Sequence, residues 1–161
     1  AILAAFLFCR VKQISFYKYM DPIAAVFPLG QTIGRWGNFF NNEAFGKPFF
    51  SGFIKLYIPD EFRPKEFSNS EYFHPTFLYE SSLNFIIFIF LFKNYSNWKD
   101  KPGKIFWVYL FSYSIIRFFL EFLRSDSLHL FGSLASAQII SAIVIILSLI
   151  NLMGAKNEKK I

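Results

Sequence analysis

Charged side chains stand inside the most apolar stretches of this sequence, where few polypeptides place them. The stretch Ile105–Leu123 contains Arg117 and Glu121, with Tyr113 four residues before the arginine and Arg124 seven residues after it. Residues three or four apart share one face of an α-helix, so these four side chains form one polar stripe. Charges within a membrane are costly and indicate either a functional site or an ion pair that holds helices in register. The spacing leaves both interpretations open.

A second apolar stretch, Pro75–Phe92, carries Glu80 beside Tyr79, with His74 at its mouth. Glu80 could pair with an arginine of another helix or belong to a binding site. Gln138, in the last apolar stretch, is expected to hydrogen-bond between helices.

Arginines at the edge of a membrane are suited to binding a phosphate. Arg35 ends the short apolar stretch Pro22–Arg35, and we expect it to lie at the same membrane boundary as Arg124. The guanidinium group offers paired donors to phosphate oxygens and keeps its charge. Neighbouring asparagines add donors, and nearby glycines allow close approach of the backbone. These are Asn38, Asn41 and Asn42, and Gly34, Gly37 and Gly46. The chemistry predicts a site for a phospholipid headgroup.

The elements that position these residues are predicted to be membrane helices. A span needs about 20 mostly apolar residues, and three stretches supply them. A fourth stretch is interrupted by Pro28 and glycines, as in segments that line a cavity. The polar residues 38–73 are interpreted as an extramembrane head with a short strand at residues 56–58, and residues 155–161 as a solvated tail. The predicted spans are Ala1–Cys9 (a truncated helix), Pro22–Arg35, Pro75–Phe92, Ile105–Leu123 and Leu134–Met153. The predicted fold is therefore an all-α polytopic membrane protein of a single domain, residues 1–161, with about four full transmembrane helices, one truncated helix and a small periplasmic head.

The distribution of cations predicts the orientation. Ten of the 17 Lys and Arg residues fall in the segments 10–21, 93–104 and 155–161, which alternate with the head and with segment 124–134. Positive charge accumulates in cytoplasmic loops, so the C-terminus is predicted inside and the head in the periplasm.

The composition excludes other classes of protein. Apolar residues make up 54% of the chain and charged residues only 17%, which does not suit a soluble domain of 161 residues. The net charge of +6 suggests nucleic acid, but the cations lie in short loops between apolar stretches, so we predict no nucleic-acid partner.

Four blocks of sequence resemble the prolipoprotein diacylglyceryl transferase family. The most specific is Gly34-Arg35-Trp36-Gly37-Asn38-Phe39, which continues through Glu43-Ala44-Phe45-Gly46-Lys47-Pro48. The others are Asp21-Pro22-Ile23-Ala24 with Pro28-Leu29-Gly30-Gln31, then His74-Pro75-Thr76-Phe77-Leu78-Tyr79-Glu80, and Tyr113 with Arg117 through Asp126. The blocks follow the family's order and spacing.

The resemblance implies an inner-membrane enzyme with seven helices and a periplasmic active face. Such an enzyme moves the diacylglyceryl group of phosphatidylglycerol onto the lipobox cysteine of a prolipoprotein, the first step of bacterial lipoprotein maturation, without metal or cofactor. By resemblance, Arg35, Arg117 and Glu121 are the catalytic residues, Glu121 orienting Arg117. Asn38, Glu43, Gly46, Tyr113 and Arg124 would shape the substrate site, together with His74, Tyr79 and Glu80, whose roles the resemblance does not define.

The family's N-terminal His-Gly-Gly loop, whose histidine is a candidate base for the thiol, has no counterpart here. The sequence begins Ala1-Ile2-Leu3 within an apolar run, so we expect a fragment that is inactive alone. The alternative is a piece of a membrane transporter or channel that uses Arg35, Arg117 and Glu121 as a conduction path. The ordered motifs favour the transferase, and transporters more often show repeated halves.

Overall fold

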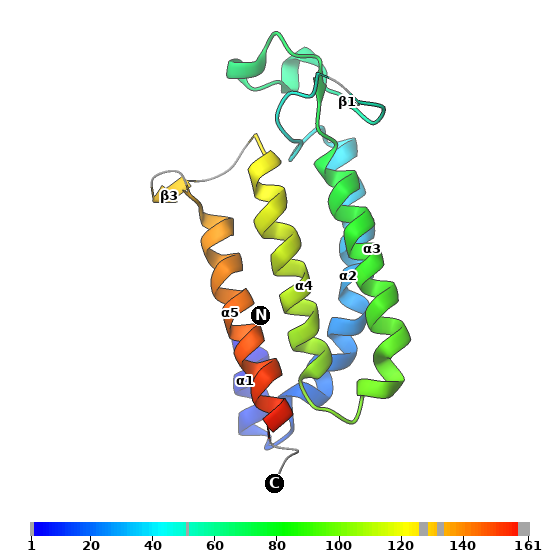
Figure 1. The fold of residues 1–161 in the computed structure, drawn as a ribbon, viewed down its shortest axis with the longest axis vertical. Helices are drawn as coiled ribbons and strands as arrows, with labels where there is room; N and C mark the ends of the chain where they lie inside the picture. Colours follow the sequence, from blue (N-terminus) through cyan, green and yellow to red (C-terminus); the bar gives the residue numbers. More distant parts are fainter. Residues whose placement is uncertain (1, 51, 126–128, 132–133, 158–161) are drawn as a thin grey trace.

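Four long helices run side by side and carry a small head at one end (Figure 1). The computed structural model describes residues 2–50, 52–125, 129–131 and 134–157. The long helices are α2 (Phe16–Phe40), α3 (Thr76–Trp98), α4 (Lys104–Leu120) and α5 (Ser136–Asn157), and the short α1 (Ile2–Val11) lies at the end away from the head. The prediction of a helical protein is confirmed.

In the described part of the chain, three helices are long and apolar enough to cross a membrane. They are α3, the stretch Lys104–Leu123 formed by α4 and the 3₁₀ turn η3 (Glu121–Leu123), and α5 over Ser136–Gly154. Large apolar side chains on them remain exposed, among them Ile86, Phe90 and Ile150. The described chain thus presents to its surroundings a surface that water would not favour but lipid would.

The helix α2 differs from the prediction. A short, broken helix was expected over Pro22–Arg35, but one continuous helix of 25 residues contains both Pro22 and Pro28. Proline removes a hydrogen bond from a helix interior, but burial of Ala24, Ala25 and Pro28 against neighbouring helices stabilises this conformation. Tertiary packing therefore outweighs the local signal, and the head begins after Phe40 rather than at Asn38.

Two other boundaries also move. The helix α3 continues from Phe92 to Trp98, so Lys93 is helical rather than in a loop. The helix α5 continues through Asn157, beyond the predicted start of the tail at residue 155, and residues 158–161 lie outside the described part of the chain.

The main core joins α2, α3 and α4 through small and apolar side chains: Ala24, Ala25, Ile87, Leu91, Ile105, Phe106 and Tyr109. The head has a core of its own, formed by Phe45, Ile58 and Phe73. Its strands β1 (Leu56–Tyr57) and β2 (Tyr72–Phe73) pair antiparallel, which confirms the short strand predicted there. The 3₁₀ turns η1 (Asp60–Phe62) and η2 (Lys65–Phe67) connect them, and a second hairpin, β3 (His129–Phe131) with β4 (Leu134–Ala135), joins α4 to α5.

Candidate active site

Glu80 lies at the centre of a network of charges that joins three helices. Its Oε1 accepts a hydrogen bond from Arg35 Nη2 at 2.6 Å, and its Oε2 lies 3.4 Å from Arg117 Nη1. The hydroxyl of Tyr113 donates to the same Oε1 at 3.2 Å. The carboxylate is buried, its side chain only 4% exposed, so it bridges two guanidinium groups away from bulk water. Of the two interpretations of Glu80, pairing with an arginine of another helix is confirmed, and Glu80 pairs with both Arg35 and Arg117.

Arg117 is also held by its own helix. Its Nη2 donates to Glu121 Oε2 at 3.1 Å, across one turn of α4 and η3. The pairing expected from their spacing of four is confirmed. Within the described residues, the two arginines and two carboxylates of the network carry no net formal charge, which reduces the cost of burying it.

The network continues a polar seam along the facing sides of the three helices. One to two turns further from the head, Tyr109 donates to Gln31 Oε1 at 3.1 Å, and its ring stacks on that of Tyr113. Asn84, one turn after Glu80, is fully buried and has no hydrogen-bond partner within the described residues. The seam thus places polar groups where an apolar interface would normally pack.

The head is fixed to this end of the bundle by a short segment that contains Gly46. The amide of Gly46 donates to His74 O at 2.9 Å, and the amide of Lys47 donates to Leu123 O at 2.6 Å. The hydroxyl of Thr76 donates to Ala44 O at 2.6 Å. The segment therefore ties the start of α3 to the end of η3.

Gly46 has no room for a side chain. A Cβ atom would lie 2.6 Å from His74 Cβ and 2.8 Å from Leu123 O. Gly34 and Gly37, by contrast, face open space, with nothing within 4 Å of the position that a Cβ atom would take. The close approach at Gly46 is made by the protein's own chain, which is a structural requirement that the prediction of a ligand-shaping glycine had not included.

The remaining predicted residues lie around the network rather than at its centre. Asn38 accepts a backbone hydrogen bond from Glu43 N at 3.0 Å, and the exposed Glu43 side chain accepts one from Asn41 at 3.2 Å. Arg124 forms a backbone bridge with Gly46.

His74 Nδ1 lies 3.4 Å from the hydroxyl of Tyr79, at the junction of head and helix. Partial burial lowers the pKa of His74 below its ordinary value of 6.5, because desolvation disfavours the charged imidazolium. The lowered pKa favours the neutral imidazole at pH 7.

An apolar groove opens at the same end of the bundle as the network. It measures about 460 Å³ and is lined by Ile54 of the head and by residues of α3 and α4: Leu78, Tyr79, Ser82, Leu83 and Leu120. Tyr79 and Leu120 directly precede Glu80 and Glu121 in the sequence, so the groove lies at the same level of α3 and α4 as these two carboxylates, although consecutive residues of a helix do not share a face. A charged cluster and an apolar groove at the same end of the bundle suit a ligand with a polar head and an apolar body.

Comparison with known proteins identifies the family. The model of the family described as prolipoprotein diacylglyceryl transferase matches residues 1–153. The chain belongs to this family. It is 47% identical over 152 residues to the phosphatidylglycerol–prolipoprotein diacylglyceryl transferase of Acaryochloris marina, covering 94% of this chain and 55% of that protein. It is 45% identical over 170 residues to that of Prochlorococcus marinus and 46% over 160 residues to that of Clostridium botulinum strain Hall, covering 98% and 99% of this chain and 56% and 62% of those proteins. The chain thus spans between half and two thirds of the length of these transferases.

Several polar residues of the chain were not predicted as part of the site. Gln31, Tyr109 and Asn84 belong to the seam, and their signal was spacing: Gln31 precedes Arg35 by four, Tyr109 precedes Tyr113 by four, and Asn84 follows Glu80 by four. Gln138 was predicted to hydrogen-bond between helices; among the described residues its Oε1 instead accepts from Ala135 N at 3.1 Å, at the start of α5.

Proposed function

We propose that this chain forms the donor site of a transferase that moves the diacylglyceryl group of phosphatidylglycerol to the cysteine thiol of a prolipoprotein. The observation that carries this proposal is the convergence of Arg35 and Arg117, from different helices, on the buried Glu80, at the end of the bundle where an apolar groove opens. Family membership supplies the reaction class, since the relatives named above carry this activity in their names.

The reaction breaks a C–O bond to phosphate and forms a C–S bond. The thiol gives up its proton to a base, its sulfur attacks the glyceryl carbon, and glycerol phosphate departs. Negative charge then accumulates on the departing phosphate, where arginines in a site of low dielectric stabilise it most. Arg35 can supply this charge while Glu80 and Tyr113 hold one of its nitrogens. Arg117 is held on two sides, by Glu80 and Glu121.

The groove supports a place for the lipid body. Its apolar lining comes from α3 and α4 at the level of Glu80 and includes Ile54 of the head. An acyl chain in this groove would bring the ester-bearing glycerol close to the two arginines. Asn38, Glu43 and Arg124 then stand at the head side of the site, where the polar headgroup and the incoming peptide with its lipobox cysteine would arrive.

We further propose that α2 is a fourth span. Its 25 residues correspond to about 37 Å of helix, and a bilayer core is about 30 Å thick. The lysines at the end away from the head support a cytoplasmic location for that end, with the head and the arginine network facing the periplasm of a bacterial inner membrane.

A chimera tests the transferase proposal. The 160 residues of the Clostridium botulinum relative that align with this chain are replaced by it, and the chimera is supplied to cells depleted of their own transferase. Lipid transfer is measured with phosphatidylglycerol labelled in its acyl chains and a lipobox peptide. We expect the chimera to label the peptide.

Arginine variants sharpen the test. Arg35→Lys and Arg117→Lys keep the charge but lose the fixed planar donors, so we expect transfer to fall by roughly 10²–10³-fold. The matched control is Arg10→Lys, in the last turn of α1 at the other end of the bundle. A chimera that is folded in the membrane but transfers no label, or arginine variants as active as the control, would contradict the proposal.

A further inference from the structure

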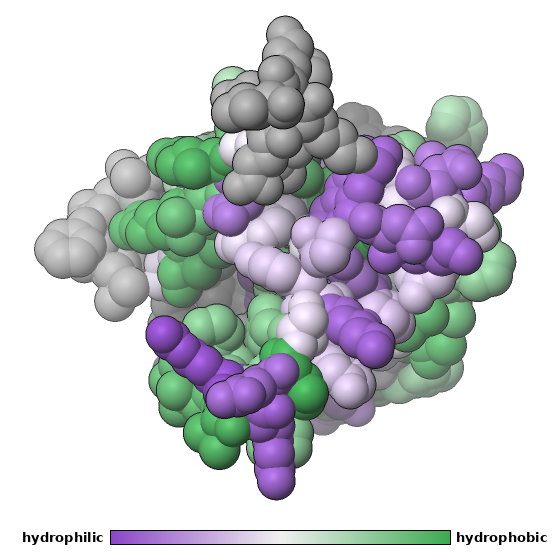
Figure 2. Space-filling view, turned by 90° about the horizontal axis from the view of Figure 1, so that it is seen from below, coloured by the Kyte–Doolittle hydropathy of each residue, from purple (hydrophilic) through white to green (hydrophobic). Residues whose placement is uncertain are grey.

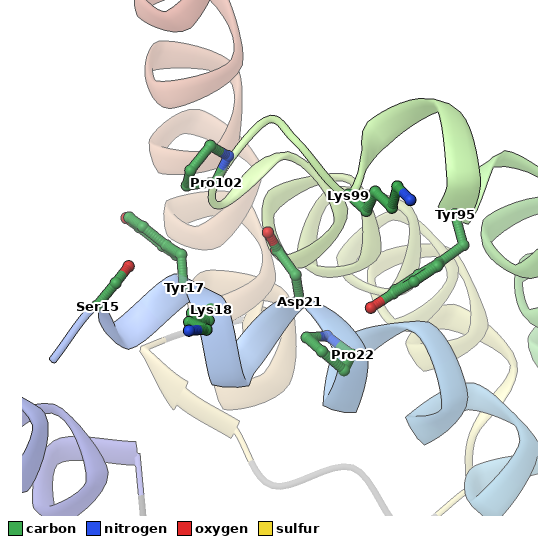
Figure 3. A pocket seen from close by; sticks show the side chains of 8 residues that line it. All are labelled: Ser15, Tyr17, Lys18, Asp21, Pro22, Tyr95, Lys99 and Pro102. Carbon is green, nitrogen blue, oxygen red and sulfur yellow. The ribbon is translucent and has the colours of Figure 1, made fainter.

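A pocket at the end of the bundle opposite the head combines two lysines with three hydroxyl groups. It measures about 470 Å³ and is lined by residues from the start of α2 and from the junction of α3 and α4: Ser15, Tyr17, Lys18, Asp21, Pro22, Tyr95, Lys99 and Pro102 (Figure 3). The arginine network lies at the head end, so this pocket is separate from the candidate active site. Hydrophilic residues gather on this end of the molecule (Figure 2).

The groups that line the pocket are mostly unused donors. Neither Lys18 nor Lys99 forms an ion pair within the part of the chain that the structure describes. Tyr17 accepts a hydrogen bond from Trp107 Nε1 at 3.1 Å, which leaves its own hydroxyl proton to donate. The hydroxyls of Ser15 and Tyr95 complete the set. Ammonium and hydroxyl donors around one cavity are the chemistry that binds an anion with several oxygens.

The one carboxylate in the lining is already committed. Asp21 is only 5% exposed, and its two oxygens accept from Gly103 N at 2.7 Å and Phe106 N at 2.8 Å. It therefore caps the start of α4, whose positive dipole end offsets its charge. Lys18 and Lys99 therefore determine the sign of the charge in the pocket.

The position of the pocket along the helices indicates which class of molecule carries the anion. Tyr95 lies in the last turn of α3, Lys99 directly follows that helix, and Pro102 precedes α4. Trp98 and Trp107 stand at the same level, and Trp and Tyr gather where a membrane meets water. The pocket thus lies at the depth of lipid headgroups and opens between helices, which suits a basic site for an anionic lipid.

We propose that this pocket binds the phosphate headgroup of an anionic phospholipid in the leaflet opposite the candidate active site. In the orientation proposed above, that is the cytoplasmic leaflet, but the binding itself does not depend on the transferase activity. The bound lipid would hold the start of α2 against the junction of α3 and α4, around the Asp21 cap. The same donors would also bind a free phosphate, and the experiment below distinguishes a lipid phosphate from a free one.

Tryptophan fluorescence tests the proposal directly. Trp98 and Trp107 flank the pocket, and the third tryptophan of the chain, Trp36, is replaced by Phe so that only these two report. The full chain is reconstituted in phosphatidylcholine vesicles that contain increasing fractions of either brominated phosphatidylglycerol or brominated phosphatidylcholine. Each lysine near the surface favours an anionic lipid by about fivefold, so for the two lysines together we expect quenching to show a preference for phosphatidylglycerol of about 25-fold.

Matched variants separate the pocket from general surface charge. In Lys18→Gln/Lys99→Gln we expect the preference to fall below about threefold. Lys93→Gln/Lys101→Gln removes the same charge from the same end without touching the pocket, so it should keep the preference. Lys18→Arg/Lys99→Arg should also keep it, and the helical circular dichroism of every variant is compared with that of the parent.

Three results would overturn the proposal. The first is equal quenching by the two brominated lipids in the parent chain. The second is an equal loss in both glutamine double variants, which would assign the preference to the surface as a whole. The third is displacement of the brominated lipid by millimolar inorganic phosphate, which would assign the pocket to free phosphate instead.

Discussion

Replacing Glu80 by glutamine tests whether this carboxylate positions the two arginines. The substitution keeps the volume of the side chain and one oxygen acceptor, but it removes the charge shared by Arg35 and Arg117. The new amide N–H₂ group must then face a guanidinium, donor against donor. The network changes from neutral to a net charge of +1.

The magnitude follows from burial and distance. Removing one partner of a buried ion pair costs about 3–5 kcal/mol, because the other charge is left without compensation. Here the arginine side chains are 23% and 17% exposed, so water can solvate part of the released charge, and we reduce the expected loss to about 2–3 kcal/mol. For a protein of this size, that corresponds to a decrease of about 5–10 °C in the melting temperature.

The kinetic effect should be specific. An anionic lipid is attracted at least as strongly to a network of charge +1, so KM for phosphatidylglycerol should stay the same or fall. The arginines lose their fixed geometry, and displacement by about 1 Å at a reacting centre can lower kcat by about 10²-fold. The assay is labelled-lipid transfer by the chimera together with thermal unfolding in detergent micelles.

The controls define the refutation. Glu61→Gln removes the same charge from an exposed position in η1, and it should change neither quantity measurably. Glu80→Asp keeps the charge and should restore part of kcat. If the melting temperature and kcat of Glu80→Gln equal those of the parent, Glu80 does not position the arginines and the reasoning from the network is wrong.

Further predictions concern the junctions and the seam. Gly46→Ala places a Cβ at 2.6 Å from His74 Cβ and at 2.8 Å from the carbonyl oxygen of Leu123, so we expect thermal unfolding to show a loss of about 1–3 kcal/mol. Because burial lowers the pKa of His74, the parent should lose stability as the pH falls below 6.5 towards that lowered pKa; melting at pH 7.5 and 5.5 should show a smaller loss in His74→Asn. Asp21→Ala uncaps two amides at the start of α4 and should cost about 1–2 kcal/mol, with faster amide exchange there. Tyr113→Phe removes one hydroxyl contact to the buried carboxylate and should cost about 1 kcal/mol in the same unfolding assay.

The sequence was sufficient where one segment carries its own signal. Long apolar stretches predicted α3, α4 and α5, because their length matches a membrane and their composition leaves no soluble alternative. The Arg117–Glu121 pair followed from a spacing of four within one helix. The helix α2 was not predicted in full, because Pro22 and Pro28 are local breaking signals, whereas the packing that keeps the helix continuous comes from other segments.

Contacts between segments were beyond such patterns. Spacing placed Glu80 on a helix face, but Arg35 and Arg117 lie 45 and 37 residues away from it, and no period tells which faces meet. Gly46 is a similar case, since its lack of space depends on His74 and Leu123, which reach it from two distant segments of the chain. The sequence identifies which charged residues are present, but only the fold shows which arginines bind the same carboxylate.

In the proposed donor site, the neutral network would keep both arginines charged within the membrane and available to a lipid phosphate. Each guanidinium group has five N–H donors, and the contacts of Arg35 use only its Nη2. Within the described residues its Nε and Nη1 have no hydrogen-bond partner, and the same holds for Nε of Arg117. A lipid phosphate can therefore bind these open donors without displacing Glu80. The carboxylate then keeps both side chains in place as charge moves onto the leaving phosphate, so that stabilisation of the transition state requires little rearrangement of the site.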